Sequence, residues 1–174
     1  MTAAQRKLCR DLVISPPRGV GQISKEEFLR KFPSSVEHGK LAVRLLAEAY
    51  EAKDAEDLQC ALIVGHTFGF APGHADILCR LVEADWHVSH EDVVSALDVL
   101  QTPDAVRALF RATQWIPGHL NFDENRSFAV KAIWALGKIP GSEAERNLEA
   151  LARSDNAILR KTAAEQLERR HKAA

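Results

Sequence analysis

The chain has 174 residues and a mass of 19.3 kDa, which suits one domain with a sizeable core and is short for two. Apolar residues make up 46% and charged residues 27%, a globular composition that excludes disorder and low complexity. Because 23 Lys and Arg residues balance 24 Asp and Glu residues, bulk attraction to nucleic acid or to an anionic membrane has no electrostatic basis. We therefore expect neither as a partner.

Two further features favour a cytoplasmic location. Residues 1–7 lead into no apolar stretch of signal-peptide length, and aliphatic runs such as residues 61–64 are too short to cross a bilayer. Cys9, Cys60 and Cys79 are an odd number of cysteines without the spacing of a metal site, so we expect reduced thiols.

Residues 1–55 predict an irregular helical N-terminal cap that leads into the first helix pair. A helix from residue 3 to residue 14 is expected to end before Pro16. Ser24 predicts the N-cap of a short second helix, and residues 38–52 predict a third helix with an apolar inward face.

From residue 56 to residue 170, apolar helices recur at a nearly constant spacing of 31 to 35 residues. The segments that fit one frame are 58–65, 93–100, 128–137 and 159–168. Between them lie helices that begin after Pro and Gly turn signals, at residues 72–73, 103 and 140–141. A unit of two helices repeated at this period predicts an all-α fold, an α-solenoid of about four to five helix pairs within a single domain, residues 1–174.

The repeat frame resembles a known family. Phe128…Ala132…Ala135-Leu136-Gly137, followed by Ser142-Glu143-Ala144…Leu148…Leu151, resembles the bacterial HEAT-like repeats, including those named after phycobilisome-lyase proteins. The resemblance covers roughly residues 56–170 and implies the solenoid fold, whereas residues 1–55 do not keep the frame. Such repeats serve as scaffolds and binding surfaces for many partners.

Three short stretches are similar to a narrower group of single-domain bacterial HEAT-repeat proteins. They are residues 25–29 (KEEFL), 85–92 (DWHVSHED) and 130–137 (VKAIWALG). That group includes immunity partners of interbacterial toxins. The resemblance therefore implies a non-catalytic, protein-binding module, and in its concrete form an immunity protein, monomeric when free, that occludes the active site of a toxin.

Two polar segments hold the candidate binding residues. One is residues 85–92, and the other is residues 113–125, a long connection that interrupts the helical period. Binding residues concentrate on long connections in a tightly repeated fold, and exposed tryptophans there make natural hot spots. The predicted partner-binding residues are Trp86, His87, His90, Glu91, Asp92, Trp115, Phe122, Asp123 and Arg126.

His87 and His90 leave alternatives open. Three residues apart and close to carboxylates, they could belong to a zinc site, although their spacing is not that of a metallohydrolase helix. The structural alternative is that Ser89 caps a helix beginning near His90. We take the structural interpretation and predict no bound metal, cofactor or catalytic residue.

Charge patterning suggests what kind of protein the partner is. Two acidic stretches, residues 48–57 and 83–92, fall at predicted repeat turns and could form one negative edge suited to a basic toxin or nuclease domain. The alternative is that they are ordinary solvated turns. Trp134, inside an apolar helix, is predicted to lie in the core.

A second class of function is open as well. The resemblance to lyase-type HEAT proteins implies an accessory protein or enzyme that acts on a chromophore–protein adduct. Such a protein needs a pocket large enough for a tetrapyrrole and a reactive group inside it. Low aromatic content, at 6% of residues, and cysteines that fall on apolar helical faces argue against this alternative.

Overall fold

The structure, a computed structural model, describes residues 1–13, 22–32, 38–124 and 126–173. These residues form ten α-helices and three short 3₁₀ turns, with no β-strand among them, which confirms the all-α prediction. None of the helices in these ranges is both long and apolar enough to cross a membrane. The predicted end of the first helix at residue 14 lies outside the described residues.

The elements follow one another in the order expected for helix pairs. The helices are α1 (Ala3–Asp11), α2 (Lys25–Lys31), α3 (His38–Ala52), α4 (Ala55–Phe68), α5 (Ala75–Val82), α6 (His90–Leu100), α7 (Val106–Ala112), α8 (Ser127–Lys138), α9 (Ser142–Leu151) and α10 (Ala157–Ala173). The 3₁₀ turns are η1 (Pro72–His74), η2 (Pro103–Ala105) and η3 (Gly118–Leu120). The first two lead directly into α5 and α7, and the third lies in the long connection before α8.

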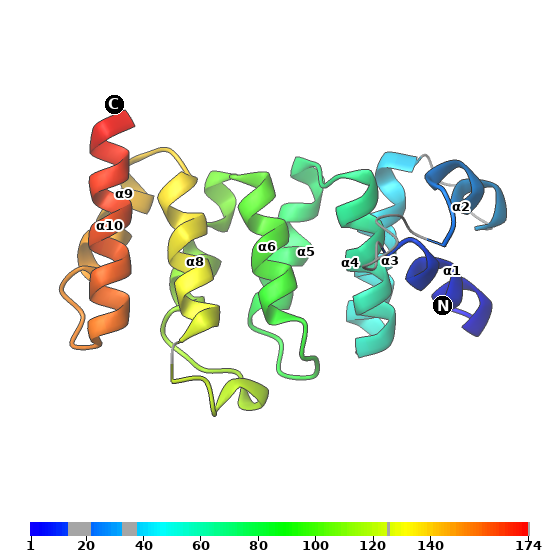
Figure 1. Ribbon diagram of the computed structural model, residues 1–174, viewed down its shortest axis with the longest axis horizontal. Coiled ribbons are helices and arrows are strands. Elements are labelled where there is room, and N and C mark those ends of the chain that lie inside the picture. Colours follow the sequence, from blue (N-terminus) through cyan, green and yellow to red (C-terminus); the bar gives the residue numbers. More distant parts are fainter. Residues whose placement is uncertain (14–21, 33–37, 125, 174) are drawn as a thin grey trace.

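From α3 onward the helices stand in two layers along the long axis of the molecule (Figure 1). Helices α4, α6, α8 and α10 form one layer, and each packs on the next. Helices α3, α5, α7 and α9 form the other, and the layers pack on each other where α3 meets α4, α5 meets α6, α7 meets α8, and α9 meets both α8 and α10. The N-terminal helices α1 and α2 lie at one end of this row and α10 lies at the other (Figure 1).

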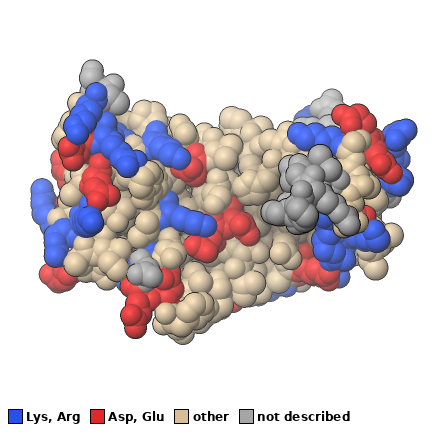
Figure 2. Space-filling model, in the orientation of Figure 1, with Lys and Arg blue, Asp and Glu red and all other residues tan. Residues whose placement is uncertain are grey.

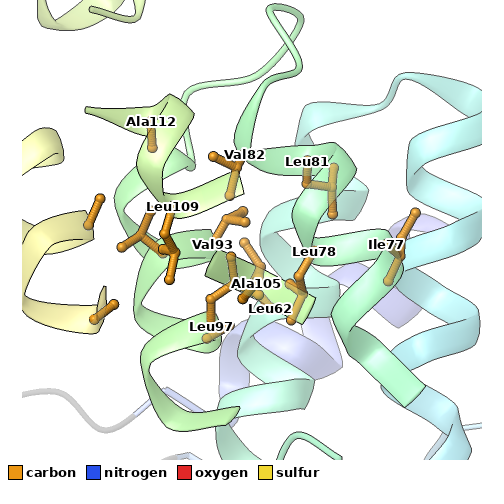
Figure 3. Close-up of a cluster of buried hydrophobic side chains, with 14 of the residues drawn as sticks. Leu62, Ile77, Leu78, Leu81, Val82, Val93, Leu97, Ala105, Leu109 and Ala112 are labelled. Atoms are coloured by element: carbon orange, nitrogen blue, oxygen red, sulfur yellow. The ribbon is translucent and has the colours of Figure 1, made fainter. Parts of the chain in front are cut away.

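One hydrophobic core runs between the layers from end to end. Figure 3 shows its middle, where Leu62, Leu78, Leu97 and Leu109, from α4 to α7, gather in one cluster. Each helix of the first layer also contributes a fully buried alanine, which lets neighbouring helices approach closely. These alanines are Ala61, Ala96, Ala132 and Ala163.

Ion pairs join the irregular N-terminal cap to the rest of the chain. The guanidinium of Arg6 on α1 contacts three carboxylates at the start of α4, from Asp54 (2.7 Å), Glu56 (2.6 Å) and Asp57 (2.6 Å). Arg10 also pairs with Glu56, at 2.7 Å. The prediction of an acidic surface is therefore wrong for these residues, because arginines 46 to 51 positions away in the sequence neutralise them.

The second acidic stretch is also paired in part. Glu83 pairs with Arg111, and Glu91 lies 3.5 Å from Lys131, so both ion pairs link successive helix pairs. Figure 2 shows basic and acidic side chains interspersed on this face rather than a surface of one sign.

The core position predicted for Trp134 is wrong. Its side chain is partly exposed, and the guanidinium carbon of Arg169 on α10 lies 4.1 Å from the centre of its ring. Trp134 shares the outward stripe of α8 with Lys131 and Lys138, both exposed. A helix that is apolar nearly all round is expected to be covered by other helices on every side. On the side of Trp134, α8 is covered instead by a long side chain, that of Arg169.

Candidate functional site

The two polar segments singled out from the sequence meet at one edge of the molecule. The loop before α6 and the connection between α7 and α8 leave the same end of the two layers and lie at the lower edge of Figure 1. The ring of His90 joins them, since its centre lies 5.4 Å from that of Trp115 and 5.1 Å from that of His119. We call residues 85–90 and 113–124 the loop edge.

The two histidines of the first segment close the end of α5. Nε2 of His87 donates to the carbonyl of Leu81 at 2.9 Å, and Nε2 of His90 donates to the carbonyl of Ala84 at 2.8 Å. A carbonyl can only accept, so each ring carries its proton on Nε2. Leu81 lies in the last turn of α5 and Ala84 lies two residues beyond its end, so the two side chains bind the main chain at and just after the C-terminus of this helix.

Burial holds both imidazoles in the neutral form. Nδ1 of His87 accepts the backbone N–H of Ser89 at 3.1 Å, which leaves no room for a second proton. Burial lowers the pKa of His87, and burial together with the nearby His87 ring lowers the pKa of His90 to about 4. The two rings stack with their centres 4.2 Å apart, so both are uncharged at neutral pH.

Ser89 takes the predicted position but not the predicted role. It precedes the first residue of α6, as expected, yet its side chain makes no capping hydrogen bond. Its backbone N–H binds His87 instead. The histidine ring therefore replaces the serine hydroxyl as the group that orders this turn.

The arrangement of the histidines does not suit a metal. Their rings are stacked face to face, and three of their four nitrogens already bind main-chain groups. Within the described ranges, no three His, Cys, Asp or Glu side chains are grouped in a way that could hold a metal ion.

Trp86 and Trp115 are partly exposed and rest against the core. The ring of Trp86 packs edge-on against Tyr50, with centres 6.3 Å apart, and the ring of Trp115 packs edge-on against Phe128, at 5.9 Å. Nε1 of Trp115 and Nδ1 of His90 are buried and have no hydrogen-bond partner among the described residues. One is a donor and the other an acceptor.

A small pocket of about 200 Å³ opens between the two loops. Its walls are two tryptophans, three histidines and one carboxylate, with small or apolar residues between them. The described lining residues are Asp85, Trp86, His87, Val88, His90, Trp115, Pro117, Gly118 and His119.

Large hydrophobic side chains project from the same two loops. Phe122 is 80% exposed, Val88 is 67% exposed and Ile116 is 41% exposed. Phe122 was predicted from the sequence, whereas Val88, Ile116 and His119 were missed. The sequence indicated these three residues only through their position beside predicted residues. A single apolar residue in a polar loop can be either buried or exposed, and the sequence pattern does not distinguish the two.

Two of the remaining predicted residues make hydrogen bonds that order the long connection. The carboxylate of Asp123 accepts the backbone N–H of Ser127 at 2.6 Å, at the N-terminus of α8. Arg126 has left-handed backbone geometry, with φ of 55°, and its guanidinium donates to the carbonyl of Thr113 at 3.1 Å. These bonds fix the two ends of the connection to each other.

The other two predicted residues, Glu91 and Asp92, point away from the pocket. Glu91 pairs with Lys131 on α8, and Asp92 lines a different cavity of about 890 Å³ between α4 and the N-terminal cap. None of the three cysteines is among the described lining residues of that larger cavity. We place no site there, because Val13 and Gln22 in its wall flank residues 14–21, which lie outside the described part of the chain.

The loop edge therefore offers aromatic and apolar surface, and its two buried imidazoles are neutral and bound to main-chain groups. Comparisons of the chain with family models, curated proteins and solved structures found no match. Its function has to be argued from this surface.

Proposed function

We propose that the protein is a binding module for another protein and that the loop edge is its contact surface. The observation that supports this most directly is the exposure of Phe122 and Val88, at 80% and 67%, beside two tryptophans anchored in the core. Aromatic side chains ringed by apolar contacts are typical of binding hot spots.

The proposal extends to the fold. We interpret the two layers of helices as a solenoid of HEAT-like helix pairs, with the loop edge formed by turns of two adjacent pairs. A stack with a continuous core presents such turns on a rigid support, which reduces the ordering cost of binding.

The charge distribution changes the partner expected from the sequence. Since Arg6 and Arg10 neutralise the carboxylates of residues 54–57, affinity for a broadly basic protein has little support at that end. We propose that apolar contacts at the loop edge supply most of the affinity. In its concrete form the partner is a bacterial toxin whose active site this edge occludes, a proposal that rests on the sequence resemblance.

Capture with matched variants tests the binding surface. The protein and its Val88→Ser and Phe122→Ser variants serve as bait in an extract of the source organism, with Val99→Ser as the control. Val99 is 60% exposed at the opposite end of α6, so its replacement removes a similar apolar side chain away from the loop edge.

A stoichiometric partner held by the wild type and by Val99→Ser, but at least tenfold less by the two loop variants, is the expected result. Equal capture by all four proteins would contradict the proposal. If the partner is a toxin, one equivalent of this protein should also inhibit its activity, and the Phe122→Ser variant should not.

A further inference from the structure

We propose that the pocket between the two loops receives one cationic side chain, an arginine or a lysine, of the protein partner. This inference rests on the proposed function, because it names the chemistry by which that partner is recognised.

The walls of the pocket are suited to a cation. Trp86 and Trp115 both line it, and the negative face of an indole ring attracts an ammonium or guanidinium group. The protein already contains one example of this contact, since Arg169 covers the ring of Trp134 with its guanidinium carbon 4.1 Å from the ring centre. Two indole rings border the pocket, and no lysine or arginine among the described lining residues occupies it.

The charges around the pocket favour the same occupant. Asp85 supplies a carboxylate, and no lysine or arginine is among the described lining residues. The basic groups of the neighbouring helices and loops are engaged elsewhere, Arg111 with Glu83 and Lys131 with Glu91. Arg126 donates to the carbonyl of Thr113. An incoming cation therefore meets one negative group and neutral rings.

Hydrogen bonding and the size of the pocket also favour a cationic side chain. His90 lines the pocket, is 1% exposed and carries an acceptor, Nδ1, without a described partner. An N–H donor is what such a buried acceptor lacks, and arginine and lysine provide several. A volume of about 200 Å³ suits one side chain, since pockets for whole small ligands usually measure roughly 300 Å³ or more.

Occupancy should depend on pH in a defined direction. The titratable groups at the pocket are His87, His90, His119 and Asp85, while Glu91 and Asp123 are held by Lys131 and by the backbone of Ser127. Acidification places positive charge on the buried rings of His87 and His90, whose pKa values lie below the usual value for histidine. This charge repels a cation, so binding should weaken as the pH falls from 7 toward 4.

Titration with small probes tests the pocket without the partner. N-acetylarginine amide is added to the purified protein while the indole N–H signals of the three tryptophans are followed by NMR. N-acetylcitrulline amide, which has nearly the same shape without the charge, is the matched control. We expect saturable shifts of the Trp86 and Trp115 signals with arginine, and at least tenfold weaker binding of citrulline.

Two further controls come from the chain itself. The Trp134 signal should not move, because Arg169 already covers that ring. The Asp85→Asn variant, altered at an exposed residue, should bind the arginine probe several-fold more weakly and keep its unfolding midpoint.

Equal binding of both probes, or no shift at Trp86 and Trp115 with either, would overturn the inference. If Phe122→Ser still abolished capture of a partner in that case, the proposed binding function would stand and only the pocket assignment would fail. If the arginine probe bound as expected while all the bait variants captured proteins equally, the pocket would stand and the proposed function would fail.

Discussion

At the scale of single residues, the stacked histidines link the stability of the fold to pH. His87 and His90 are neutral in the folded protein because burial lowers their pKa values, that of His90 from about 6.5 to about 4. The unfolded chain binds protons at these rings in a pH range where the folded chain does not. The part of the stability that depends on the neutral rings is therefore fully present above pH 6.5 and is lost as the pH falls toward 4.

Urea unfolding between pH 7.5 and pH 4.5 measures this effect. We expect the free energy of unfolding to fall by about 1–3 kcal/mol across that range. In the His90→Gln variant an amide can still donate to the carbonyl of Ala84 but does not titrate, so the dependence on pH should become shallower. An identical slope in the variant would show that other groups cause the loss.

Phe122 and Phe128 are six positions apart, and we expect replacement of each to affect the stability of the fold very differently. Phe122 is 80% exposed, whereas Phe128 is 3% exposed and packs against His90 and Trp115. Phe122→Ala should change the free energy of unfolding by less than about 0.5 kcal/mol, and Phe128→Ala should lower it by about 3–5 kcal/mol. Chemical denaturation of the two variants gives both values, and a large loss in Phe122→Ala would mean that this side chain is part of the core.

At the scale of helices, a glycine explains how closely α10 approaches α8. A Cβ added at Gly137 would lie 2.5 Å from Oε1 of Gln166 and 3.0 Å from its Cβ, so the buried Gln166 side chain has to shift. Alanine has a higher helix propensity than glycine by about 1 kcal/mol, but here that gain is opposed by the cost of moving Gln166. We expect Gly137→Ala to destabilise the protein by about 1–3 kcal/mol.

A double-mutant comparison checks that the cause is the contact between the helices. Gln166→Ala removes the nearest clashing atom and keeps Cβ, so Gly137→Ala should cost less in that background than in the wild type. Calorimetric or urea unfolding of the four proteins gives the difference. An equal loss in both backgrounds would place the strain within α8 instead.

Helices were predictable where the signals are local in the sequence. The predicted helix over residues 38–52 matches α3, and Ser24 caps α2 by accepting the N–H of Glu27 at 3.1 Å. Pro103 begins a helical turn as expected. Each of these features depends on residues a few positions apart, and their geometry follows from backbone hydrogen bonding and the fixed φ of proline.

The site was predictable only in part, because its contacts join distant segments. The sequence located the loop edge through Trp86, Trp115 and Phe122, but it gave no sign that His87 and His90 bind carbonyls at the end of α5. It also could not place Arg6 on the carboxylates of α4, since that pairing depends on how α1 docks. Helical periodicity shows which face of a helix is apolar, not which neighbour covers it.

At the scale of the whole molecule, the row of helices separates the loop edge from the C-terminal end. The edge is built by α5 to α8, while α9 and α10 pack on α8 and, for α9, also on α7. If the row is the solenoid that we propose, each helix pair is stabilised mainly by its neighbours, so damage at one end should remain local. A change in the middle of the row should reach both ends.

Two fully buried leucines test this separation. Leu97 lies on α6 in the middle of the row, and Leu148 lies on α9 near its end. Replacing either with alanine should cost about 2–5 kcal/mol. Hydrogen exchange should then increase mainly in α9 and α10 for Leu148→Ala, and that variant should still bind the arginine probe at the loop edge. Leu97→Ala should increase exchange from α5 to α8 and weaken probe binding, because it loosens the packing of the helices that support the two loops. Equal exchange patterns would instead mean that the chain unfolds as one cooperative unit.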